Sequence, residues 1–177
     1  MISEIEFLDE FTDKEKDILG KYSSNLFTLS TFYNANKRII RGGKLEDETE
    51  TFLLRYWQAV VDNIDPWKEL KNKEISKVDL RENYIITQSV IIQVLGRLGN
   101  YFYLNKKVNL VETLKGLSKV DWRRSASVWK LRTIRENGRM INNEDAIILT
   151  CNVVKQILSI PLDCAEMVRE EKRSKGK

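Results

Sequence analysis

The residues with the clearest chemical potential are six cations in one short stretch of the chain. Between Trp122 and Ile141 these six face a single acid, Glu136, so the stretch carries a net charge of +5 where the whole chain carries +4. The cations are Arg123, Arg124, Lys130, Arg132, Arg135 and Arg139. Guanidinium and ammonium groups bind the phosphate oxygens of DNA. The stretch, which we call the basic segment (residues 119–143), therefore predicts phosphate contacts with DNA.

An alternative role is open for each of these cations, because acids lie close to them in the sequence. Asp121, Glu136 and the acidic residues 1–17 could pair with the arginines, and the acidic N-terminus could dock on the basic segment. Surface ion pairs of this kind are common and contribute little to stability. The arginines are therefore either DNA contacts or members of structural ion pairs.

Two tryptophans lie within the basic segment. Trp122 and Trp129 are seven positions apart, and large indole rings tend to be buried while neighbouring guanidinium groups stay in water. We expect both rings to pack inward and fix the segment, with at least Arg123 or Arg124 facing solvent. We assign Asp121 and Gly138 to the same structural framework.

Most familiar catalytic sites are excluded by composition. The chain has no histidine and only two cysteines, Cys151 and Cys164, so it lacks the residues of Ser-His-Asp and Cys-His catalysis and of the usual structural zinc sites. Gly42-Gly43-Lys44 lacks the upstream glycine and the following Ser or Thr of a phosphate-binding loop. We expect reduced core cysteines, no cofactor, no metal and no enzymatic activity. Besides a binding function, an enzyme that acts through carboxylates is an alternative.

Length and composition predict one domain over residues 1–177. The chain is 42% hydrophobic and 32% charged, which is typical of soluble globular proteins. No apolar run approaches the roughly 20 residues of a membrane span, and the acidic N-terminus has the wrong charge for a secretory signal. We expect a cytoplasmic protein without membrane association, and a frayed polar tail at residues 170–177.

Apolar residues recur three and four positions apart, which predicts helices rather than strands. Long helices are expected over 24–41, 49–63, 84–104 and 143–158, and shorter ones bring the total to seven to nine in an all-α fold. Thr12-Asp-Lys-Glu15 has the spacing of a capping box and predicts a short helix to about Leu19. The expected core is Phe52, Tyr56, Trp57, Val60, Val94, Leu95, Leu98, Val154 and Leu158.

Gly96 and Gly99 lie inside the expected helix 84–104, where each costs about 1 kcal/mol relative to alanine. A close approach of another helix backbone is the structural explanation, and a ligand contact is the alternative. No stretch alternates polar and apolar residues over a strand length, and no Asn-Gly turn lies between two such runs.

Four stretches, at 25–36, 56–67, 94–100 and 116–129, carry a resemblance to a known family. The most specific piece has the pattern Leu-x-x-Ile/Val-Asp-Trp-x-Arg-x-x-x-x-Trp, followed by Asn137-Gly-Arg139. Its positions are taken here by Leu117, Val120, Asp121, Trp122, Arg124 and Trp129. In order and spacing the four stretches resemble the C-terminal half of the DNA sulfur modification protein DndB and its relatives with a DGQHR motif.

The resemblance implies association with DNA and negative regulation of the DNA phosphorothioation genes, without sulfur chemistry of its own. The family's DGQHR motif belongs to an N-terminal α/β domain, and a chain without histidine lacks it. The sequence is then a fragment, a split gene product or a stand-alone helical relative. An alternative function is a protein-interaction module that docks on a DGQHR half or on other modification proteins.

Overall fold

The computed structural model describes residues 2–20, 23–44 and 46–175. Within these ranges the chain forms nine α-helices and a single two-stranded parallel sheet, in which Thr12–Asp13 (β1) pairs with Phe27–Thr28 (β2). The expected helical fold is confirmed. No helix of the described chain combines the length and hydropathy that a bilayer crossing requires.

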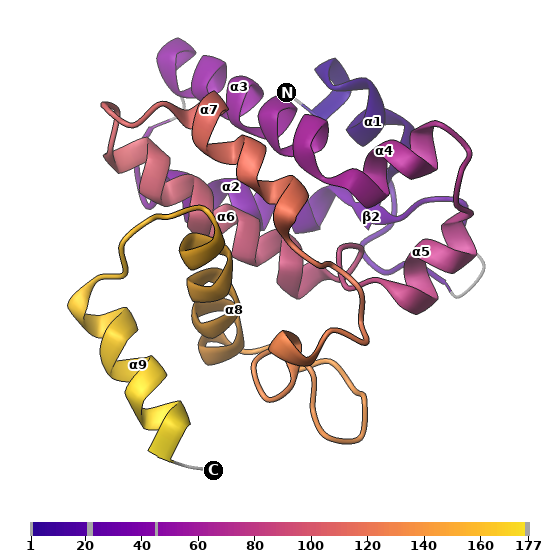
Figure 1. Ribbon diagram of the computed structural model, residues 1–177. Coiled ribbons are helices and arrows are strands. Elements are labelled where there is room, and N and C mark those ends of the chain that lie inside the picture. Colours follow the sequence, from indigo (N-terminus) through magenta and orange to yellow (C-terminus); the bar gives the residue numbers. More distant parts are fainter. Residues whose placement is uncertain (1, 21–22, 45, 176–177) are drawn as a thin grey trace.

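Helix α6 (Ser89–Leu104) lies at the centre of the fold, packed against α2 (Leu29–Ile40) and α8 (Glu144–Ile157) (Figure 1). A Cβ added to Gly96 would lie 2.9 Å from the carbonyl oxygen of Ala35, and one added to Gly99 would lie 2.8 Å from a side-chain carbon of Ile39. Only glycine therefore lets α2 approach this closely. The expected approach of another helix backbone is confirmed at Gly96, whereas Gly99 makes room for side chains, those of Ile39 and Tyr56.

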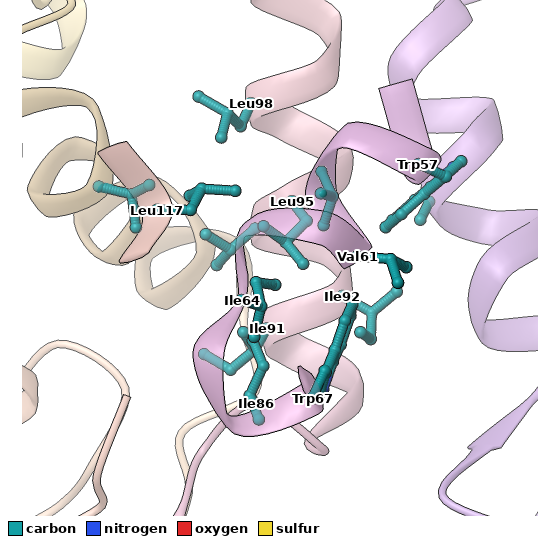
Figure 2. Close-up of a cluster of buried hydrophobic side chains, with 14 of the residues drawn as sticks. Trp57, Val61, Ile64, Trp67, Ile86, Ile91, Ile92, Leu95, Leu98 and Leu117 are labelled. Carbon is teal, nitrogen blue, oxygen red and sulfur yellow. The ribbon is translucent and has the colours of Figure 1, made fainter. Parts of the chain in front are cut away.

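The apolar core is built where α3 (Asp47–Asn63) and α4 (Asp65–Lys71) meet α6. Figure 2 shows Trp57, Trp67 and Leu95 in one cluster with side chains of the neighbouring elements. The expected core is confirmed for all its members but one. Phe52 is only partly buried, because it lies at the rim of α3 against the ring of Tyr103, with 5.3 Å between the ring centroids.

The N-terminal prediction is wrong. The first elements are a 3₁₀ turn, Ile2–Glu4, and α1, Glu6–Phe11, which ends where the capping box was expected to start a helix. The packing of apolar side chains sets the position of this helix: α1 buries Phe7, which stacks on Trp67 with the ring centroids 5.1 Å apart. Helix α1 packs near α4, and Figure 1 places it at the opposite end of the molecule from the basic segment. The acidic N-terminus therefore does not dock on the arginines.

Two of the predicted long helices begin later than expected. Helix α2 starts at Leu29, where Thr28 Oγ1 accepts a hydrogen bond from the backbone N–H of Thr31 (3.3 Å). The expected helix 84–104 begins only at Ser89, as α6, and residues 84–88 form a link to it from the separate helix α5 (Lys77–Asn83). Ile85 donates its N–H to the carbonyl of Trp122 (2.9 Å) instead of starting the helix, and residues 85–88 form a turn closed by a hydrogen bond from the N–H of Gln88 to the carbonyl of Ile85 (2.9 Å).

The chain ends with α7 (Leu110–Leu114), 3₁₀ turns at Lys115–Lys119 and Ser127–Trp129, then α8 and α9 (Cys164–Lys175). Where the sequence suggests fraying from residue 170, α9 is helical as far as Lys175; residues 176–177 lie outside the described residues. Cys151 is in the core, where burial raises the pKa of its thiol to about 12. Cys164 was expected in the core but is exposed, because it begins α9 at the surface.

Candidate nucleic-acid interface

The basic segment leaves the helices after the turn at Lys115–Lys119 and returns at α8. Figure 1 shows it as open loops that project from one end of the molecule. The link before α6 holds its base: Arg124 donates its backbone N–H to the carbonyl of Asn83 (2.7 Å), and Tyr84 forms an antiparallel bridge with Arg123. The end of α5 and the start of the link, where the sequence predicted a helix from residue 84, therefore anchor the candidate interface.

The two tryptophans fix the segment from inside. Trp122 and Trp129 are 2% and 0% exposed, and their rings stack with centroids 6.0 Å apart at an interplanar angle of 11°. Trp129 Nε1 donates to the carbonyl of Asp121 (2.7 Å), so the ring also closes the loop between them. The expected inward packing of both indoles is confirmed.

A second anchor is the backbone carbonyl of Trp129, which accepts hydrogen bonds from the three N–H groups of residues 132–134 at 3.1–3.2 Å. The chain reverses here through Leu131, whose φ is 57°, a left-handed conformation that is costly for a leucine. Leu131 is nevertheless 41% exposed. The tight turn thus presents an apolar side chain at the surface.

The far end of the segment is a short hairpin tip that the sequence did not predict. Ile134 and Met140 form an antiparallel bridge, Arg135 donates its N–H to the carbonyl of Arg139 (2.8 Å), and Gly138 donates to the carbonyl of Arg135 (2.9 Å). Gly138 has a φ of 78°, which favours glycine. Arg135 and Arg139 therefore lie opposite each other at the tip, and both are exposed.

Four of the six predicted phosphate ligands have exposed side chains, namely Arg123, Lys130, Arg135 and Arg139, and Arg124 is half-buried. Arg123 donates to both oxygens of Asp121 at 2.9 Å, and these hydrogen bonds lower the pKa of the carboxyl. Within the described ranges the other four exposed or half-buried cations have no ion-pair partner.

Arg132 differs from the other five cations. It is 9% exposed, and its two terminal nitrogens donate to the two carboxylate oxygens of Glu170 in α9 at 2.6 and 2.7 Å. One of them also donates to the carbonyl of Leu149 (2.9 Å). These contacts occupy the guanidinium group, so Arg132 has the structural role that the sequence left as the alternative, and we remove it from the candidate DNA contacts.

Helix α9 also has a buried charge cluster that sequence reasoning missed. Glu166, 1% exposed, accepts hydrogen bonds at 2.8 Å from Lys155 of α8 and from Arg97 of α6. Burial raises the pKa of Glu166, but the hydrogen bonds from Lys155, from the N–H of Asp163 and from Arg97 outweigh it and lower the pKa overall. The available signal was Asp163-x-x-Glu166, a capping-box spacing that starts α9.

The pKa of Glu170 is lowered in the same way. Burial raises its pKa, while hydrogen bonds from Arg132 and Asn152 lower it and prevail. Glu166 and Glu170 are four positions apart and lie on one face of α9. Through them, α9 is tied to α6, α8 and the basic segment at once. In the residues that the structure describes, no group of three His, Cys, Asp or Glu side chains could hold a metal ion.

Comparison with known proteins identifies a family. A family model described as DndB, DNA-sulfur modification-associated, matches residues 1–161, so the match ends three residues before the first residue of α9. No match was found among curated proteins or among solved structures. The matched residues include the stacked tryptophans, the hairpin tip and every exposed cation of the basic segment. The chain belongs to the DndB family of DNA-sulfur modification-associated proteins.

Proposed function

We propose that this chain is a DNA-associated regulatory protein of the DNA phosphorothioation system, which lowers expression of the modification genes. Its DNA contacts are Arg123, Arg124, Lys130, Arg135 and Arg139. The observation that carries the proposal is their placement: five cations project from one segment whose opposite side is fixed by a buried tryptophan stack. A fixed array binds phosphates at a smaller entropic cost than a flexible arm.

The local charge supports the same proposal. Asp121 and Glu136 are the only acids among residues 119–141, and Asp121 is engaged by Arg123. Arg135 and Arg139 are joined across the tip by a backbone hydrogen bond, so they reach neighbouring positions on a ligand. Contacts to phosphates position a protein on DNA without reading its sequence. We therefore expect the arginines to supply affinity for any duplex.

The test compares two duplexes of equal length, one from upstream of the modification genes and one unrelated. The purified chain should bind both by fluorescence anisotropy at low salt. The triple variant Arg123→Ala/Arg124→Ala/Arg135→Ala should lose affinity for both duplexes alike. A matched control, Lys16→Ala/Arg55→Ala/Lys107→Ala, removes three exposed cations from other surfaces and should keep its affinity.

Regulation needs a second readout. A reporter under the promoter of the modification genes should be repressed by the wild-type chain, and repression should be lost with the triple variant but not with the control. Absence of any binding at low salt, or full affinity in the triple variant, would contradict the proposed DNA contacts. A reporter that does not respond to the wild-type chain would contradict the regulatory role alone.

A second candidate function, docking on other sulfur-modification proteins, is favoured by a groove between the basic segment, α8 and α9. Its volume is about 880 Å³, and its apolar lining includes Leu131, Leu149 and Val168. Leu131 and Val168 are 41% and 48% exposed, which is unusual for large apolar side chains. Leu131→Lys/Val168→Lys should then abolish binding to a co-expressed modification protein while DNA affinity is kept.

A further inference from the structure

Helix α2 carries a second basic surface that the proposed contacts do not use. The helix has no acidic residue, and Lys37, Arg38 and Arg41 lie in its last turn and at its C-cap. The side chains of Lys37 and Arg41 are exposed, and that of Arg38 is half-buried. Within α2 itself, this end of the helix therefore carries only positive charges.

These cations line a groove where the start of α6 and the start of α8 meet α2. Its volume is about 620 Å³. Besides the three cations and Ile147, the lining consists of hydroxyl and amide side chains: Ser30, Thr31, Asn34, Ser89, Gln93 and Asn142. None of the lining residues is acidic. Arg, Lys, Ser, Thr, Asn and Gln are the side chains through which proteins hold the phosphates and sugars of DNA.

The wall of the groove is rigid. Arg38 donates to both carboxylate oxygens of Glu144 at 2.8 and 3.0 Å, and Gln93 donates to the carbonyl of Thr31 (3.1 Å). Glu144 therefore neutralises Arg38 and fixes α2 against α8. In the described chain Glu144 forms no ion pair with the other two cations at this end of α2, Lys37 and Arg41.

Lys37 and Arg41 are the remaining cations of the groove. In the described part of the chain neither forms an ion pair; Lys37 lies 5.5 Å above the ring of Tyr33, which is 62% exposed. The groove thus offers two cations that have no ion-pair partner in the described chain.

The simpler explanation of these cations is the helix dipole, because positive charge near a helix C-terminus is stabilising. The dipole accounts for cations on α2 itself. It does not account for the hydrogen-bonding side chains that α6 and the residues before α8 contribute to the same groove, or for the lack of an acid in the lining. Those features match a polyanionic ligand.

The groove also lies close to the proposed DNA contacts. Asn142 in its lining follows Arg139 by three residues, and three residues of chain span at most about 11 Å. This is about the width of the major groove of DNA, roughly 12 Å. A duplex held at the hairpin tip therefore has backbone within reach of the groove.

We propose that the groove between α2, α6 and α8 is a second contact surface for the phosphate backbone of duplex DNA, with Lys37 and Arg41 as its free cations. This inference rests on the proposed DNA association of the basic segment. It adds that the duplex extends past the hairpin tip onto the helical body.

The experiment measures the salt dependence of duplex binding for Lys37→Ala/Arg41→Ala and for the control Arg55→Ala/Lys107→Ala, which also removes one Arg and one Lys from a groove. The first pair should flatten the slope of log affinity against log salt by about 0.9 for each phosphate that the variant no longer neutralises, and the control should leave the slope unchanged. Lys37→Arg/Arg41→Lys keeps both charges and should restore binding, which separates a missing phosphate ligand from a destabilised helix.

Each outcome decides the matter. If the wild-type chain binds DNA and the alanine pair keeps its slope, the groove is not a contact surface while the basic segment still is. The same holds if the control flattens the slope equally, since only net charge is then at work. If the wild-type chain does not bind DNA at low salt, both proposals fail.

Discussion

The basic segment has two edges that differ in what holds their side chains. The inner edge, made of Trp122, Trp129 and Arg132, is buried and bound to the helices. The outer edge faces solvent or lies half-buried and consists of Arg123, Arg124, Lys130, Arg135 and Arg139. In the described chain one of these cations, Arg123, forms an ion pair, with Asp121. Arg132 and Arg135 are three residues apart and are equivalent in charge. Burial and a partner on α9, not residue type, separate a structural arginine from one that is available to a ligand.

The largest effect should come from removing the centre of the inner edge. Trp129→Ala takes away a fully buried ring, its stacking on Trp122 and the hydrogen bond to the carbonyl of Asp121. It should lower the free energy of unfolding by about 3–5 kcal/mol, the usual range for a large aromatic truncated in a core. Chemical denaturation measures this. The neighbour Val128→Ala, 38% exposed, is the control and should change little.

The next effect tests the link between the inner edge and α9. Arg132→Met leaves Glu170 without its main cation in a site where Glu170 is only 20% exposed. Breaking a buried pair in this way costs about 3 kcal/mol. An equal loss for Arg135→Met, whose side chain is exposed, would show that the two edges do not differ.

A pH series should separate the buried carboxylates of α9 from the others. The pKa values of Glu166 and Glu170 are lowered in the folded chain from an ordinary value of 4.5. Their stabilisation is therefore fully present above pH 4.5 and is lost as pH falls through the lowered pKa values. Glu166→Gln/Glu170→Gln should be less stable than wild type at pH 7, and the difference should shrink towards pH 3. Glu136→Gln/Glu171→Gln, both exposed, should follow the wild-type curve.

Sequence patterns predicted the parts of the molecule that bury apolar residues periodically. The apolar residues spaced three and four apart on α3 and the glycines on α6 predicted where the core lies. Trp122 and Trp129 predicted which side of the basic segment is buried. The same rule explains the error at the N-terminus, where the aromatic contact of Phe7 with Trp67 overrode a capping-box spacing.

Long-range polar contacts were not predictable in the same way. The role of Arg132 depends on Glu170, 38 residues later, and the late start of α6 after residues 84–88 goes with a hydrogen bond from Ile85 to Trp122. The hairpin tip at Gly138 was missed because the bridge that flanks it joins single residues and no alternating strands exist to be recognised.

The smallest effect on stability is expected at the outer edge. Arg135→Ala/Arg139→Ala removes two exposed cations with no ion-pair partner in the described ranges, so the free energy of unfolding should change by less than about 0.5 kcal/mol. Thermal melts in parallel with wild type measure this. A loss of several kcal/mol would mean that the tip depends on these side chains and is not a free surface.

The most direct test of the DNA assignment is the salt dependence of duplex binding for the two edges side by side. With three to five phosphate contacts, the wild-type slope of log affinity against log salt should lie between about −2.7 and −4.5. Arg135→Ala/Arg139→Ala should flatten it by about 1.8 if both side chains contact phosphates, and Arg132→Met, measured where it is still folded, should leave it unchanged. An unaltered slope in the outer-edge pair, or a flattened one in Arg132→Met, would contradict the assignment of DNA contact to the outer edge.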